Sequence, residues 1–252
     1  MHSVNAANTA GVIFDSKLNF GKQINAVVRS SFFQLRQIAK LKPLLSFKDL
    51  ETFIHAFISS RLDYSNALYM GLNHSSLYRL QLVQNAAARL LTGAKKREHI
   101  SPVLASLHGL PVHYRIHFKI FLFVYKDLNG VAPSYLSELL SYQQTPRSLR
   151  SSDKFLLQIP RSRLNFKVDR AFSVAGPRLW NSIPLDVRSA PSIPVFKSRL
   201  KTYLYSLAFT LMFIEDYMVL KAHHTERTIT RVMLLCILHN TLNKYLTKQL
   251  LL

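Results

Sequence analysis

The chain of 252 residues has little of what several classes of protein require. Its single cysteine, Cys236, excludes a disulfide framework and a cysteine-based zinc site, and is typical of a reducing compartment. Only 7 glycines are present, and neither a Walker loop nor a Gly-x-Gly-x-x-Gly sequence occurs. The sequence therefore predicts no nucleotide cofactor.

Acidic residues are also scarce. The chain has 13 Asp and Glu against 33 Lys and Arg, which gives a formal net charge of +20. Such an excess argues against an ordinary neutral enzyme and predicts attraction to polyanions. Nucleic acid is the first candidate and an anionic membrane surface the second. Because 48% of the residues are hydrophobic, the chain can still bury a substantial core.

Neither an export signal nor a long hydrophobic run is visible. The first ten residues lack a basic region followed by an apolar one. The longest uncharged apolar stretch, Tyr203–Ile214, is shorter than the roughly 20 residues that span a bilayer. We therefore expect an intracellular protein of the cytoplasm or nucleus.

Apolar residues recur mostly at three- and four-residue steps, which predicts a mainly α protein. A strand is expected at Gly11–Asp15, and a second in the alternating segment Arg163–Phe172. The expected helices are Lys22–Lys42, one beginning after Ser46, Ser76–Leu91, His113–Leu128, a short one from Pro133 to Leu140, and Ser192 to about Leu207.

The first long helix carries a row of cations on its polar face. Lys22, Arg29, Arg36 and Lys40 are spaced by seven, seven and four residues, which returns to nearly the same angle on a helix. An ordinary solvated face is one explanation, but such faces usually mix Glu with Lys. Here no acid is present and Phe33 lies among the cations, so we favour a surface that faces phosphates.

Two further groups are candidates for the same role. Gln81, Asn85 and Arg89 recur at four-residue steps on the helix Ser76–Leu91. They could contact nucleic acid, or they could belong to an ordinary packed helix. Lys95–Arg97 follow the end of that helix, where their charges could also simply complement the helix dipole.

Several segments occur in unbroken order between Gly11 and Phe209: GVIFDSKLNF, SRLDYSNALY, LQLVQNAAARLLTG, HISPVLASLHGLPVHYRIHFKI, APSYLSELL, SLRSSD, RAFSVAGPRLWNSIP and FKSRLKTYLYSLAF. Together they resemble the C-terminal part of the polymerase protein of non-long-terminal-repeat (LINE-type) retrotransposons. The resemblance implies a remnant of the reverse transcriptase palm at 1–15 and a helical thumb-like bundle at 16–131. A small basic α+β domain at 132–208 and a poorly defined tail at 209–252, outside the resemblance, would follow.

In that family the thumb holds the template–primer duplex by its backbone. The resemblance thus implies sequence-independent binding of RNA, DNA or an RNA–DNA hybrid, with no cofactor. The contacts that we predict are Lys22, Arg29, Arg36, Lys40, Gln81, Asn85, Arg89, Lys95, Lys96 and Arg97. The alternative is a basic helical module that binds an anionic membrane surface or acidic proteins, and of these we consider a membrane unlikely.

The residues for catalysis are missing from the sequence. A reverse transcriptase palm needs carboxylates that hold two divalent ions, supplied in part by an adjacent Asp pair. No Asp-Asp occurs, and the nearest imitation, Phe213–Asp216, lies after the thumb-like region rather than before it. We therefore expect a catalytically incomplete fragment, truncated at its front, that is not an enzyme on its own.

Metal and hydrolase sites are weaker possibilities. His113 and His117 lie one helical turn apart, a spacing that could ligate zinc, but no Glu follows His113 and no third ligand is evident. No Gly-x-Ser-x-Gly frames a nucleophile. The sequence thus favours ordinary core or surface histidines and predicts no metal. For 209–252 we favour a tail outside the fold over a membrane-surface or partner helix.

Overall fold

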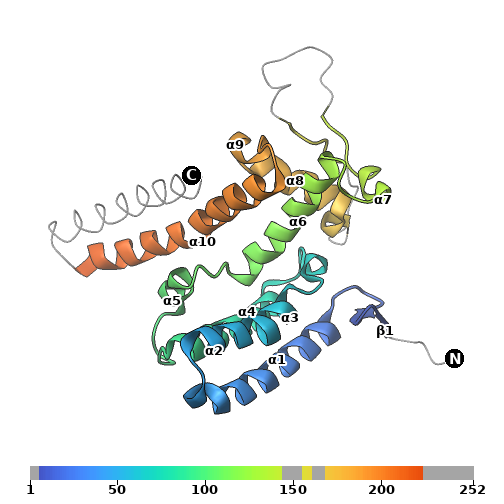
Figure 1. Ribbon diagram of the computed structural model, residues 1–252. Coiled ribbons are helices and arrows are strands. Elements are labelled where there is room, and N and C mark those ends of the chain that lie inside the picture. The colour runs from blue at the N-terminus through green and yellow to red at the C-terminus, as the bar shows by residue number, and fades with distance from the viewer. Residues whose placement is uncertain (1–5, 144–154, 161–167, 224–252) are drawn as a thin grey trace. The chain divides into compact units, whose positions relative to one another are not determined.

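The computed structural model describes residues 6–143, 155–160 and 168–223 (Figure 1). Contacts divide the chain into two compact units, Met1–Tyr205 and Ser206–Leu252. The regions predicted at 16–131 and 132–208 therefore fall in the first unit, apart from the last residues of the second region. The predicted mainly helical fold is confirmed, and it includes one small two-stranded sheet.

The sheet is a hairpin of β1 (Ala6–Thr9) and β2 (Val12–Asp15). The strands are antiparallel and Thr9 pairs with Val12, so the connection has two residues. Both of them have positive φ, 50° at Ala10 and 72° at Gly11, as the tightest hairpin turns require. The sequence predicted β2 but not β1, whose residues AANT lack an alternating apolar pattern.

The turn after β2 is organised by Asp15. Its carboxylate accepts hydrogen bonds from the backbone N–H groups of Lys17, Asn19 and Phe20. These bonds, the one from Asn19 first, hold the pKa of Asp15 below its usual value, against the opposing effect of burial. The chain then enters α1 (Gly21–Leu41), within one residue of the predicted bounds.

Local signals also mark the start of the second predicted helix and the end of the third, although the third begins two residues before the predicted Ser76. In α2 (Phe47–Ile54), the Ser46 side chain accepts a hydrogen bond from the Asp49 N–H, as expected of an N-cap. A π-helical turn, His55–Ser59, and α3 (Ser60–Asp63) continue it. The helix α4 (His74–Thr92) ends at Gly93, which has the positive φ of a glycine cap.

The later regular elements are helices as well: α5 (Ile100–Ser106), α6 (Val112–Leu128), α7 (Ser134–Ser137), α8 (Phe172–Ser182), α9 (Leu185–Arg188) and α10 (Ile193–His223). An isolated antiparallel bridge pairs Tyr142 with Leu157. The sequence predicted α6 and the start of α10, but not α5, α8 or α9. It also ended α10 at about Leu207, whereas the helix continues into the region predicted as a tail. None of the helices that the structure describes is both long and apolar enough to cross a bilayer.

The strand predicted at Arg163–Phe172 is wrong where it can be compared. Its first five positions lie outside the described residues, Val168–Arg170 form a 3-10 turn, and α8 begins at Phe172. The contacts of Arg170 account for this turn. Its guanidinium donates to the carbonyl oxygens of Met70 (2.8 Å) and Leu18 (3.0 Å). These contacts from distant segments, which an alternating pattern cannot reveal, hold the chain in a tight turn.

Two hydrophobic clusters meet along α6. The first is built mainly by α1, α2 and α4, and Ile116 of α6 belongs to it. The second surrounds Trp180 and Phe196, and Phe121 of α6 belongs to that one. Because α6 contributes to both clusters, it links the helices of the first cluster to the residues that follow.

Candidate nucleic-acid interface

The predicted row of cations lies on the outer face of α1. We call Lys22, Arg29, Arg36 and Lys40 the α1 stripe; all four are exposed. The buried residues Ile24 and Ile38 point to the opposite side, toward α4. Among the described residues, no side chain forms a hydrogen bond or ion pair with the stripe. At about 1.5 Å per residue it extends roughly 27 Å along the helix axis.

Two neighbouring side chains enlarge this surface. Phe33 lies between Arg29 and Arg36 and is 51% exposed, so its ring is open to a stacking partner. Arg61 of α3 donates from Nη1 to the Ser30 hydroxyl, 2.5 Å away, and is itself exposed. No sequence pattern indicates Arg61, because its position beside α1 depends on a contact between separate helices.

The predicted contacts on α4 lie in a different environment. We call Gln81, Asn85 and Arg89 the α4 face; all three are half-buried and engaged with their own chain. Gln81 donates to Asn85 Oδ1 (2.8 Å), and its Oε1 accepts the backbone N–H of Val112, the first residue of α6 (2.9 Å). Arg89 donates to the carbonyl oxygen of Glu98 (3.1 Å). These groups fix α4 to the start of α6 and to the following loop.

The last predicted group, the loop cluster Lys95, Lys96 and Arg97, is exposed. A hydrogen bond of Lys42 indicates where this loop cluster lies. The Lys42 ammonium donates to the carbonyl oxygen of Leu90 at 2.6 Å. That bond joins the C-terminal ends of α1 and α4, which point the same way in Figure 1. The loop cluster therefore leaves α4 at the same end of the helical layer as Lys40.

The histidine pair on α6 fits a structural role. The rings of His113 and His117 lie 4.1 Å apart between centroids, and His117 also contacts Phe121 edge-on. Burial, and secondarily the neighbouring His113, lowers the pKa of His117 to about 4. Within the described ranges no group of three or more His, Cys, Asp or Glu side chains is arranged to hold a metal ion.

The ten predicted residues therefore do not form one continuous contact surface of equally available side chains. The α1 stripe and the loop cluster are exposed, whereas the α4 face is committed to internal hydrogen bonds. Comparison of the chain with protein-family models, with curated proteins and with solved structures finds no match.

Proposed function

We propose that the chain binds the phosphate backbone of nucleic acid through the α1 stripe, with little dependence on sequence. The observation that carries the proposal is the row of four exposed cations on one helix face, none paired with another described residue. Phosphates on one strand of a duplex recur about every 3.4 Å along the axis, so a stripe of this length can face several of them. The resemblance to a reverse transcriptase thumb points to an RNA–DNA hybrid as the first ligand to test.

The loop cluster and Phe33 extend the proposed contact. Lys95, Lys96 and Arg97 continue the cationic surface beyond the end of α1. Phe33 would stack on an unpaired base where the duplex gives way to single strand. The α4 face, in this proposal, contributes by holding the helices in place and not by touching nucleic acid.

We also propose that the chain, as a fragment of a LINE-type retrotransposon polymerase, binds without catalysing. Primer extension on an RNA template with magnesium or manganese should not exceed that of a mock purification. Incorporation that disappears on Asp216→Asn would contradict this part of the proposal.

A second candidate is an anionic membrane surface, favoured by the junction of α1 and α2. Leu44 is 84% exposed and Phe47 57% exposed there, and both lie close in sequence to Lys40 and Lys48. Apolar side chains flanked by cations are typical of interfacial binding.

One titration separates the two candidates. Nucleic-acid binding predicts saturable binding to an RNA–DNA hybrid, with log affinity falling linearly with log salt concentration. Vesicles of anionic phospholipid should then bind weakly. Binding to vesicles without binding to the hybrid would reject the nucleic-acid proposal and support the membrane.

A further inference from the structure

The turn between α1 and α2 carries the most exposed large apolar side chain of the described residues (Figure 1). This residue is Leu44, which is 84% exposed, and Phe47, three residues later, is 57% exposed. We call Leu44 and Phe47 the apolar tip; Leu41, at the end of α1, is exposed as well. Apolar residues exposed singly need no explanation, whereas several at one place are typical of an interaction site.

The backbone that carries the apolar tip is held in place on both sides. The Leu45 N–H donates to the Lys42 carbonyl oxygen at 3.2 Å, and the Leu45 side chain packs against the first hydrophobic cluster. Before the turn the Lys42 ammonium is bonded to Leu90, and after it Ser46 caps α2. The fold therefore presents the apolar tip to solvent on a fixed support.

The charged residues around the apolar tip are mostly basic. Lys40 and Lys42 precede it, Lys48 follows it, and the loop cluster lies at the same end of the helical layer. The acid nearest in sequence, Asp49, accepts a hydrogen bond from the Ser46 hydroxyl at 2.7 Å as part of the start of α2. The tip is thus suited to a partner that combines negative charge with apolar surface.

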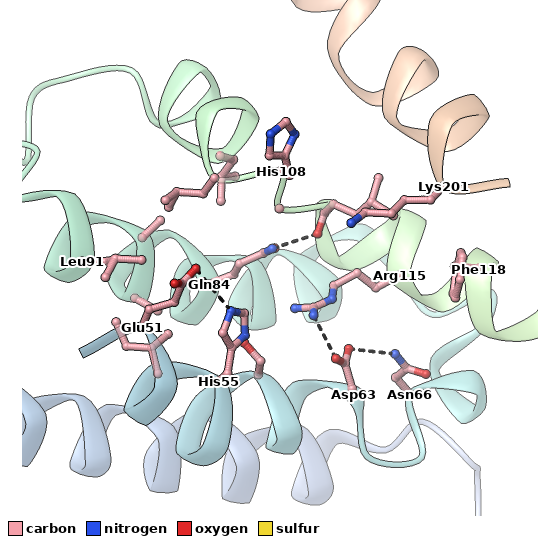
Figure 2. Close-up of a pocket in the computed structure, with 18 of the residues that line it drawn as sticks. Glu51, His55, Asp63, Asn66, Gln84, Leu91, His108, Arg115, Phe118 and Lys201 are labelled. Carbon is pink, nitrogen blue, oxygen red and sulfur yellow. Dashed lines mark hydrogen bonds and ion pairs between the residues drawn. The ribbon is translucent and has the colours of Figure 1, made fainter. Parts of the chain in front are cut away.

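The hollow beside α4 differs from the apolar tip, because its polar groups have partners within the chain (Figure 2). Arg115 donates to Asp63 at 2.8 Å, and Gln84 donates to the Leu110 carbonyl oxygen at the same distance. Carboxylates and lysines line this hollow together, so it favours no ligand of one charge. The apolar tip is therefore the stronger candidate for an external partner.

Three occupants of the tip can be compared. A second copy of the chain would bring another net charge of +20 toward it, so repulsion opposes this contact. A membrane would gain little, because even a single myristoyl chain gives only marginal attachment and the tip has fewer apolar carbons. Base pairs fit best, since Leu and Phe are among the side chains that duplex-bending proteins insert between them.

We propose that the apolar tip inserts between two base pairs of the duplex held by the α1 stripe and bends that duplex. This rests on the proposed function and deepens it, because it makes a bent duplex the bound form. The α1 stripe, which ends four residues before Leu44, holds the backbone on one side of the insertion. Lys48 and the loop cluster hold the backbone on the other side.

Energy transfer between dyes at the two ends of an RNA–DNA hybrid tests the proposal, with the full chain titrated onto a hybrid of about 25 base pairs. Saturation should raise the transfer efficiency, because such insertions bend a duplex by about 20–90°. A hybrid with one central mismatch should bind several-fold more tightly than the fully paired hybrid, since a mismatched step is more easily unstacked.

The double variant Leu44→Ser/Phe47→Ser should lose both the rise in energy transfer and the preference for the mismatch. It removes no charge, so it should keep the salt dependence of the wild type. Leu44→Ser alone, at the more exposed position, should lose part of each effect. The matched control is Val131→Ser/Tyr135→Ser, which replaces two residues beside α7 that are also well exposed and should bend the hybrid as the wild type does.

The possible failures are distinguishable. Saturable binding that leaves the hybrid straight would overturn the insertion but not the proposed function, whereas no saturable binding would overturn both. Equal loss of bending in the folded tip variant and its control would also reject the insertion. If the tip variant bends the hybrid normally but no longer binds vesicles of anionic phospholipid, the tip contacts a membrane and the insertion is wrong.

Discussion

The outer face of α1 and the α4 face carry polar residues at comparable spacings, but their side chains have different partners. The α1 stripe is exposed and unpaired among the described residues, whereas Gln81 and Arg89 bond to segments that lie further along the chain. The difference arises from position in the fold. The four residues of the α1 stripe are exposed, while α4 is packed between α1 and α6.

Helical periodicity alone cannot distinguish these two cases. It identifies residues that share a face, and it does so correctly for both helices. Whether that face remains available depends on which backbone groups are brought against it. On α4 those groups include the Val112 N–H, which the α6 N-terminus leaves without a partner inside its own helix. We therefore expect changes on α4 to affect stability and changes on α1 to affect binding.

Among these tests, acid should change the free energy of unfolding most. The effect arises on α6, to which α4 is hydrogen-bonded. His117 lies on α6, and its pKa of about 4 is below the ordinary value of 6.5 because burial disfavours the charged ring. The unfolded chain therefore binds more protons between these values, so stability rises with pH across this window. The contribution of neutral His117 to the free energy of unfolding is complete above about pH 6.5. As the pH falls toward about 4, this contribution, of the order of 2 kcal/mol, is lost.

Urea unfolding at pH 7.5 and pH 4.5 measures this contribution. His117→Gln should lose much of the pH dependence, while Arg29→Gln/Arg36→Gln should keep that of the wild type. An unchanged pH dependence in the histidine variant would show that His117 is not the group responsible.

Gln81→Leu should be the next largest change. It leaves the Val112 N–H without its side-chain acceptor and Asn85 without its donor, at a cost of about 1–2 kcal/mol in unfolding free energy. Affinity for an RNA–DNA hybrid, measured on folded protein, should stay within about twofold. If stability is unchanged and hybrid binding is strongly weakened, the α4 face contacts nucleic acid and the contrast drawn between the two helices is wrong.

The smallest expected difference in stability is between variants of Lys42 and Lys40, two lysines close together at the end of α1. Lys42 donates to Leu90 at the C-terminal end of α4, where its charge also complements the helix dipole. Lys42→Gln should therefore cost about 1 kcal/mol, whereas Lys40→Gln should stay within about 0.5 kcal/mol of the wild type. Thermal unfolding of the two variants, which have equal net charge, measures the difference. Equal destabilisation would indicate that Lys40 also has a structural partner.

Much of the helical layer was accessible from sequence because its signals are local. Ser46 capping α2 and Gly93 ending α4 require only neighbouring residues, and the α1 stripe requires only a period. The missed features depend on distant groups. Arg170 is positioned by carbonyl oxygens of Leu18 and Met70, far from it in sequence, so its alternating surroundings suggested a strand.

The candidate functional residues also include some that depend on local sequence and some that depend on distant contacts. Exposure of the α1 stripe follows from its place opposite the core residues of its own helix. The burial of Asn66 and Gln84 could not be predicted, because these two polar residues belong to different elements and are buried only as a result of packing. The sequence alone does not indicate whether a polar side chain has hydrogen-bond partners in the fold.

The central proposal is that the α1 stripe binds the nucleic-acid backbone. Its most direct test is the salt dependence of RNA–DNA hybrid binding, measured by fluorescence anisotropy. Removal of one cation that pairs with a phosphate should flatten the log–log slope by about 0.9, the value for B-form DNA. Arg29→Gln/Arg36→Gln should therefore flatten it by up to about 2 units and weaken binding across sequences, whereas Lys197→Gln/Arg199→Gln should change it little. Equal weakening and equal slopes in the two variants would contradict the account and leave only diffuse attraction between a basic protein and a polyanion.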